Sequence, residues 1–114
     1  MRTIMTCLAV AAFLVVSIGS TGKAEAFEEI VSVVDIGCDE GGECFIGISP
    51  ALSSSNTSCS NRSVVRLQTA WAGSASIYKT ALTAYLSGRK LKVNPWWSPC
   101  VQNSPRPNYV VLTN

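Results

Sequence analysis

The sequence of 114 residues contains no histidine, and this absence removes whole classes of catalytic site. Ser-His-Asp and Cys-His arrangements need an imidazole as the general base, so the chain can build neither. It also shows no serine–lysine pattern suited to a lysine base. The paired carboxylates of a glycoside hydrolase would both have to come from one acidic hairpin. We therefore expect a protein that is not an enzyme.

Metal ligands are equally scarce. Without histidine and without any Cys-x-x-Cys pair, a structural zinc site has no donor set. The acidic turn with Asp39, Glu40 and Glu43 offers carboxylate oxygens to calcium, but it lacks the spaced Asp-x-Asp-x-Asp-Gly pattern of a dedicated calcium loop. A solvated turn is the expectation, with no metal and no cofactor.

In the predicted mature chain, residues 27–114, acidic residues occur only in the first part and basic residues only in the second. No acidic residue follows Glu43, and no basic residue lies between positions 24 and 61. The basic residues are few and not interleaved with a stacking motif, so we expect no nucleic-acid binding. Such segregation suits the pairing of one half of the fold, or of one subunit, with the other. The simpler interpretation places the first and fourth strands side by side, with Asp35 near Lys90 or Lys92.

An apolar run of the ~20 residues that a membrane-spanning helix needs is also missing. The shorter run at residues 7–16 follows Arg2 and precedes Ala24-Glu25-Ala26, which offers small residues at the two positions that a signal peptidase reads. We interpret residues 1–26 as a secretory signal peptide, and expect a secreted or periplasmic mature chain without a membrane span. Residues 27–114 are enough for one domain only.

Cysteines compensate for the small core that such a domain can build. Cys38, Cys44, Cys59 and Cys100 remain after cleavage, an even number in a chain bound for an oxidising compartment. Three pairings are possible, and loop-closure entropy does not choose among them. A three-residue hairpin loop at 40–42 would put Gly42 where a left-handed residue is needed and Cys38 opposite Cys44, at a spacing that suits a disulfide. We predict the pairs Cys38–Cys44 and Cys59–Cys100.

The segment 74–93 predicts a helix, a glycine stop and a strand. Ile77, Tyr78, Ala81, Leu82 and Tyr85 recur at helical spacing and form an apolar stripe, which Ala84 and Leu86 widen. Ser74 or Ser76 is expected to cap the first turn, and Gly88 to end the helix in the left-handed conformation.

Short β-branched stretches predict strands elsewhere, at residues 30–36, 44–48, 63–68, 91–93 and 109–113. The order is strand, strand, strand, helix, strand, strand. Five short strands avoid exposed edges when the sheet curls and closes, so the expected fold is mainly β with one helix, a small five-stranded OB-like Greek-key barrel. An open α+β sandwich is the alternative.

The central segment resembles that of the pertussis-like and subtilase-cytotoxin-type toxin B subunits. The residues that carry the resemblance are Trp71, Tyr78, Ala81, Tyr85, Ser87, Gly88, Leu91, Val93 and Trp96. They span roughly a quarter of the chain. The resemblance implies an OB barrel, a homo-oligomer that is a pentamer in that family, and host glycans as ligands. Residues 28–44 do not reproduce the family's sugar-contacting pattern, so no binding residue is carried over.

These observations favour a secreted, non-catalytic binding module that resembles a glycan-binding toxin B subunit. The alternative is a secreted or periplasmic structural or inhibitory protein that acts by protein–protein contact.

Trp96, Trp97 and Arg106 are the candidate binding residues. The two tryptophans stand between Pro95 and Pro99. On extended backbone adjacent side chains point in opposite directions, so we expect at least one indole to be exposed. Arg106 is expected to supply charge-assisted hydrogen bonds beside it. Alternatively, each indole covers a different part of a small core.

Overall fold

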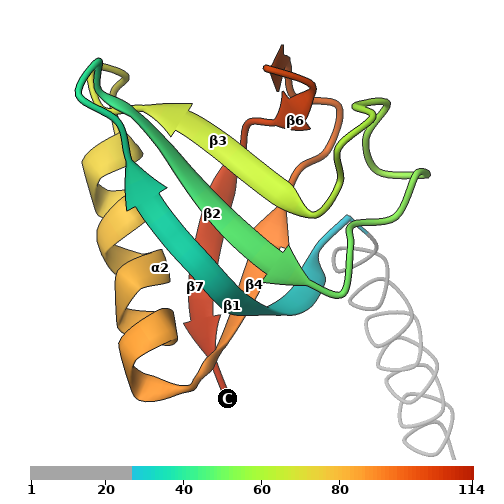
Figure 1. Ribbon diagram of the computed structural model, residues 1–114. Helices are drawn as coiled ribbons and strands as arrows, with labels where there is room; N and C mark the ends of the chain where they lie inside the picture. The colour runs from blue at the N-terminus through green and yellow to red at the C-terminus, as the bar shows by residue number, and fades with distance from the viewer. Residues whose placement is uncertain (1–26) are drawn as a thin grey trace, which may run out of the picture.

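The computed structural model describes residues 27–114, which form one curved five-stranded sheet, one helix and a two-stranded ribbon (Figure 1). The predicted signal peptide lies outside the described residues. The elements are β1 (Glu29–Cys38), β2 (Glu43–Ser49), β3 (Val64–Gln68), α2 (Ser74–Ser87), β4 (Lys90–Asn94), β5 (Cys100–Val101), β6 (Ser104–Pro105) and β7 (Tyr109–Thr113). The prediction of a mainly β fold with one helix is confirmed, and the expected strands differ from the observed ones by at most two residues at either end.

The order of the strands in the sheet is β3-β2-β1-β4-β7, and every neighbouring pair is antiparallel. The chain leaves edge strand β3, passes through α2 and returns beside β1 as β4. This return next to the first strand is a Greek-key connection. The strand order is compatible with the expected OB-like barrel. Among the described residues β3 and β7 are the two edges of this sheet.

Strand β1 bends at a bulge. Its register with β2 shifts between Val33 and Asp35, which leaves Val34 as an extra residue. The part of β1 before the bulge pairs with β4, from Glu29 to Val31, and the part around and beyond it pairs with β2. The first and fourth strands therefore lie side by side as predicted. The bend carries Asp35 to a position opposite Gly47 of β2, so the predicted approach of Asp35 to Lys90 or Lys92 is wrong.

The β1–β2 hairpin confirms the sequence prediction. Cys38 is paired with Cys44 in register, and the two form a disulfide. Gly42 has φ 90°, the left-handed conformation that the loop requires. The second disulfide joins Cys59 to Cys100, as predicted.

The core lies between the sheet and α2. The hydrophobic residues in it come from every strand of the sheet except β7, from α2 and from the loop after β2: Val31, Cys44, Ile46, Ile48, Leu52, Val65, Leu67, Ala81, Ala84, Leu91 and Val93. Trp71, Ile77 and Tyr78 pack against this cluster from its border. Within residues 27–114, no helix has both the length and the apolar character needed to cross a membrane.

Two expectations about α2 are wrong. The apolar stripe is narrower than predicted. Ala81 and Ala84 are buried and Ile77 and Tyr78 pack against the core, but Tyr85 and Leu86 are 45% and 74% exposed. Small residues on the buried face let the helix backbone approach β1 and β7 closely. The N-cap is Gly73, with φ 80° and no side-chain hydrogen bond, in place of Ser74 or Ser76. The predicted C-cap Gly88 is confirmed, with φ 72°.

The β5–β6 ribbon was not predicted. Its two-residue loop, Gln102-Asn103, has positive φ at both positions, as type I′ hairpin turns do. The loop lacks the usual sequence signal of such turns, Asn-Gly or Asp-Gly, and glutamine seldom adopts a positive φ.

Candidate binding surface

The two adjacent tryptophans occupy the central positions of a tight turn. The N–H of Ser98 donates to the carbonyl of Pro95 at 3.1 Å, which places Trp96 and Trp97 at the second and third positions. Trp97 has φ 45°, in the left-handed region that bulky side chains rarely adopt and that glycine tolerates. The surrounding contacts therefore hold an indole where the backbone alone would favour glycine.

Both indoles are exposed, Trp96 by 38% and Trp97 by 56%. Neither is a core residue. The expectation of opposite directions was wrong, because it assumed extended backbone and Trp97 is in a turn. The two rings lie edge to face, with centroids 5.8 Å apart. Phe27 lies on the other side of Trp96, with ring centroids 3.9 Å apart and planes inclined by 33°. Phe27, Trp96 and Trp97 form what we call the aromatic cluster.

Polar contacts fix the turn from two sides. The Asn94 carboxamide oxygen accepts from the N–H of Trp96 at 2.9 Å, and Asn108 Nδ2 donates to the carbonyl of Trp96 at 3.1 Å. The N–H of Trp97 donates to the carbonyl of Asn56 at 3.1 Å, which docks the turn on loop 50–63.

Loop 50–63 is itself held in place by Glu29 and by a disulfide. Both carboxylate oxygens of Glu29 accept from the N–H of Ser53 at 3.0 Å, and one also accepts from Asn56 Nδ2 at 2.8 Å. The Cys59–Cys100 disulfide ties the end of the loop to the strand just after the turn. The aromatic cluster is therefore supported by a restrained turn and loop, so less conformational entropy is lost when a ligand binds.

The side chain of Arg106 contacts another tryptophan, Trp71. Its guanidinium carbon lies 4.0 Å from the ring centroid of Trp71, the residue that leads into α2. This geometry is a cation–π contact. Arg106 thus lies at the N-terminal end of the helix.

Two adjoining hollows lie at this end of α2. The first, of about 140 Å³, is lined by Leu67, Ala72, Ser74, Ile77, Pro99, Arg106, Pro107 and Asn108. The second, of about 270 Å³, is lined by Ala72, Gly73, Ser76, Ile77, Thr80, Asn108, Tyr109 and Val110. Because they share Ala72, Ile77 and Asn108, we treat them as one groove between the start of α2 and the segment leading into β7, and call it the Arg106 groove.

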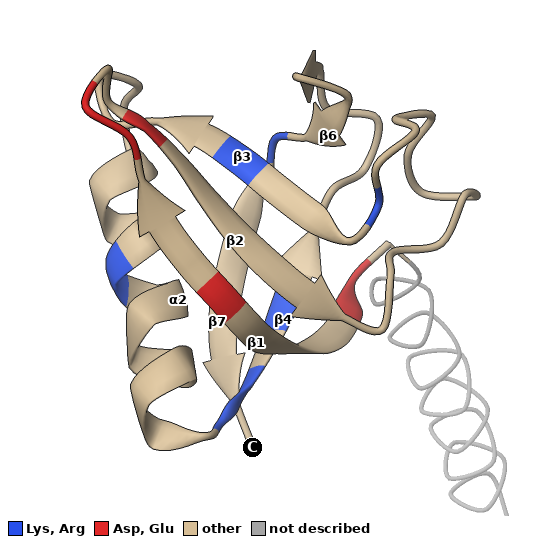
Figure 2. Cartoon of the chain, in the orientation of Figure 1, with Lys and Arg blue, Asp and Glu red and all other residues tan. Residues whose placement is uncertain are grey.

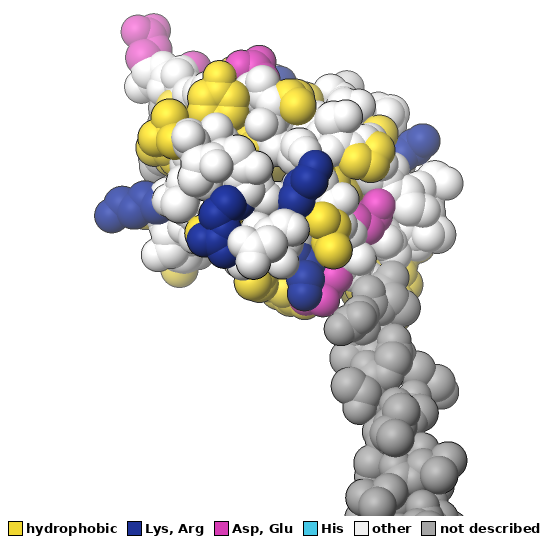
Figure 3. Space-filling view, turned by 90° about the horizontal axis from the view of Figure 1, so that it is seen from below, with side chains coloured by type: hydrophobic (Ala, Val, Ile, Leu, Met, Phe, Trp, Pro, Cys, Tyr) yellow, Lys and Arg dark blue, Asp and Glu magenta, His cyan; other side chains and the backbone are white. Residues whose placement is uncertain are grey.

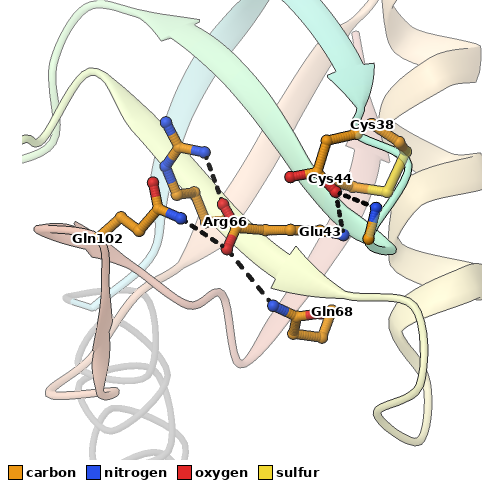
Figure 4. A network of polar contacts seen from close by, with 8 residues as sticks. Cys38, Glu43, Cys44, Arg66, Gln68 and Gln102 are labelled. Carbon is orange, nitrogen blue, oxygen red and sulfur yellow. Dashed lines mark hydrogen bonds and ion pairs between the residues drawn. A yellow bond between two sulfur atoms is a disulfide. The ribbon is translucent and has the colours of Figure 1, made fainter.

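The acidic turn does not present its carboxylates to a shared cation. Oδ1 of Asp39 accepts from the N–H groups of Gly41 and Glu43 at 2.9 and 3.0 Å. The carboxylate of Glu43 points to the other side, where it accepts from Arg66 at 2.9 Å, Gln102 at 3.0 Å and Gln68 at 3.4 Å (Figure 4). Within residues 27–114 no group of three or more His, Cys, Asp or Glu side chains is placed to hold a metal ion.

Acidic residues lie at the β1–β2 turn and along β1, while basic residues lie on β3, β4, α2 and the loops (Figure 2). Lys92 Nζ approaches Glu28 at 4.0 Å, and Lys90 donates to Ser32 Oγ at 2.7 Å. On the face seen in Figure 3, basic side chains are separated by neutral and hydrophobic ones and form no continuous stripe.

Sequence reasoning missed Phe27, Ser74 and Asn108 as parts of these surfaces. Phe27 lies far from the tryptophans in sequence, and Ser74 was assigned to capping. The sequence shows the Pro-Arg-Pro segment at 105–107, but the approach of Arg106 to Trp71 depends on how β5, β6 and β7 are placed.

No known protein family, curated protein or solved structure matches the chain.

Proposed function

We propose that residues 27–114 form a secreted, non-catalytic carbohydrate-binding module of the toxin B-subunit type, and that the aromatic cluster is its ligand-binding surface. The observation that carries the proposal is the exposed pair of indoles on a turn that holds Trp97 in a conformation its side chain disfavours. Strained residues concentrate at functional sites, where the surrounding structure over-determines them. Flat aromatic faces bind the apolar faces of sugar rings.

Two further features support the proposal. The disulfides in the described chain fit a protein that matures in an oxidising compartment. The strand order suits the OB-like scaffold that the resemblance implies.

The test is a glycan array probed with the mature chain and with Trp97→Gly and Trp97→Ala. Both substitutions remove the indole, but only glycine relieves the left-handed strain, so Trp97→Gly should melt at a temperature no lower than Trp97→Ala. Each variant should weaken binding of a glycan found on the array by more than about 1 kcal/mol, as expected for an aromatic anchor. Trp96→Ala should do the same.

Lys79→Gln, an exposed change on α2, is the control and should bind as the parent does. A mature chain that binds no glycan would contradict the function. Glycan binding that survives all the tryptophan substitutions would place the binding surface elsewhere.

A second candidate is a structural or inhibitory protein acting by protein contact. In the described chain the outer edge of β7 has no neighbouring strand, and exposed Ile30 and Val111 flank Lys92 across β1, β4 and β7. An open strand edge beside apolar side chains is a common site for strand addition. A chain that is silent on the array but is retained by a protein partner, and released by Val111→Lys, would favour this candidate.

A further inference from the structure

The first turn of α2 has free hydrogen-bond donors. Its N-cap is a glycine without a side chain, and α2 carries no acidic residue in its first turn. The N–H groups of Ala75 and Ser76 have no acceptor among the described residues. A helix start of this kind carries a partial positive charge that no side chain of the described protein satisfies.

Ser74 adds a nearly buried polar residue at the same place. The residue is only 2% exposed, lines the first hollow of the Arg106 groove, and makes no side-chain hydrogen bond with any described residue. A nearly buried serine that lines a hollow and has no protein partner for its hydroxyl leaves that hydroxyl available to a ligand.

Arg106 supplies the charge. Among the described residues that line the two hollows, it alone has a charged side chain. Its guanidinium makes no ion pair and no side-chain hydrogen bond within residues 27–114, although Trp71 holds it in place by the contact at 4.0 Å. The backbone N–H of Arg106 donates to the carbonyl of Pro99 at 3.1 Å, and Pro105 and Pro107 on either side are buried. The segment that carries the guanidinium is therefore restrained.

We propose that the Arg106 groove binds a small oxyanion, namely a carboxylate, sulfate or phosphate group. The guanidinium fork of Arg106 contacts two of its oxygens, the Ser74 hydroxyl donates to one, and the open first turn of α2 supplies the favourable field. The first hollow, of about 140 Å³, has room for one such group. This inference does not depend on the proposed carbohydrate binding, because the aromatic cluster is not part of the groove.

The experiment is an NMR titration of the backbone amides of the mature chain with sodium sulfate, sodium phosphate and sodium acetate. Sodium chloride at equal ionic strength is the reference. Saturable shifts at residues 74–77, absent with chloride, are expected with at least one of the three anions. The anion that binds most tightly shows whether the groove prefers a tetrahedral oxyanion or a carboxylate. Shifts that grow linearly, or that chloride reproduces, would overturn the proposal.

Substitutions decide whether the groove is responsible. Arg106→Gln should weaken binding at least about tenfold, since a hydrogen bond to a charged group contributes roughly 1.5–3 kcal/mol. Lys79→Gln removes one positive charge from α2, outside both hollows, and should leave binding unchanged. Undiminished binding by Arg106→Gln would overturn the proposal.

Ser74→Ala is a second test of the groove, which decides the question if Arg106→Gln does not fold. Because it removes a hydroxyl with no protein partner, it should not lower the melting temperature, yet it should weaken anion binding several-fold. Full binding by this variant would contradict the role of Ser74. Trp97→Gly should bind the anion as the parent does, which separates failure of this proposal from failure of the carbohydrate proposal.

Discussion

Glu28 and Tyr109 join the two ends of the described chain. The Tyr109 hydroxyl donates to Oε2 of Glu28 in a short hydrogen bond, while Oε1 of the same carboxylate lies 4.0 Å from Lys92. The hydrogen bond to Glu28 raises the pKa of Tyr109 above its usual 10.0, because ionisation would remove the donated proton and place two anions together. The stabilisation that this shift represents is present below the ordinary tyrosine pKa and is lost as the pH rises through the folded-state value.

We predict that Tyr109 is the tyrosine whose ionisation responds to Glu28. Tyrosinate absorbance at alkaline pH, compared between the parent and Tyr109→Phe, should show a group that titrates above 10.0. Glu28→Gln should move this titration to lower pH, because the amide brings no second negative charge. Tyr85→Phe is the control, since the Tyr85 hydroxyl makes no hydrogen bond with a described residue. An unchanged titration in Glu28→Gln would refute the assignment.

Helix α2 shows how packing selects among apolar residues. Periodicity correctly predicted a helix, but hydrophobicity alone included Tyr85 and Leu86 in the buried stripe. The sheet instead contacts the face with Ser74, Ala81 and Ala84, because small side chains permit close approach.

The end of α2 depends on Gly88. A Cβ at this position would meet no heavy atom within 4 Å, so the effect of a substitution is confined to the left-handed φ of 72°. Gly88→Ala should therefore lower the free energy of unfolding by about 1 kcal/mol, measured by urea denaturation. Lys79→Ala, in the exposed middle of the helix, should change it by less than about 0.5 kcal/mol. If Gly88→Ala is as stable as the parent, another residue ends the helix.

The Cys59–Cys100 disulfide connects parts of the molecule that the sheet does not. It joins the loop after β2, which supports the tryptophan turn, to the β5–β6 ribbon, whose tip residue Gln102 reaches Glu43. The two cysteines are 41 positions apart, whereas Cys38 and Cys44 are 6 apart within one hairpin.

Removal of the longer-range disulfide should destabilise the protein more. Cys59→Ala with Cys100→Ser should cost about 4 kcal/mol, against about 2.4 for Cys38→Ser with Cys44→Ala, in the chain-entropy description. Urea denaturation of the two double variants measures the difference. Loss of glycan binding by the first variant, at a temperature where it remains folded, would further show that the disulfide positions the aromatic cluster. Equal destabilisation by both would contradict the entropic argument.

Local patterns in the sequence were sufficient for the elements themselves. The spacing of apolar residues predicted α2 and all strands of the main sheet, because the helical period of 3.6 residues and the strand period of two depend only on neighbouring residues. Gly88 itself predicted where the helix ends. The glycines between Cys38 and Cys44 predicted the hairpin and its disulfide, and the remaining two cysteines then had one pairing left. Asn-Gly-type turn signals do not cover Gln102-Asn103, so the short ribbon was missed.

The surfaces that we propose as binding sites were decided by tertiary structure. The bulge at Val34 determines which strand Asp35 faces, and the packing against loop 50–63 holds Trp97 in a left-handed turn. The course of the chain after β5 brings Arg106 to Trp71 and the open end of α2. Local periodicity specifies which side of an element is buried. It does not specify which distant segment meets the other side, because that depends on strand order, bends and loop docking summed over the whole chain.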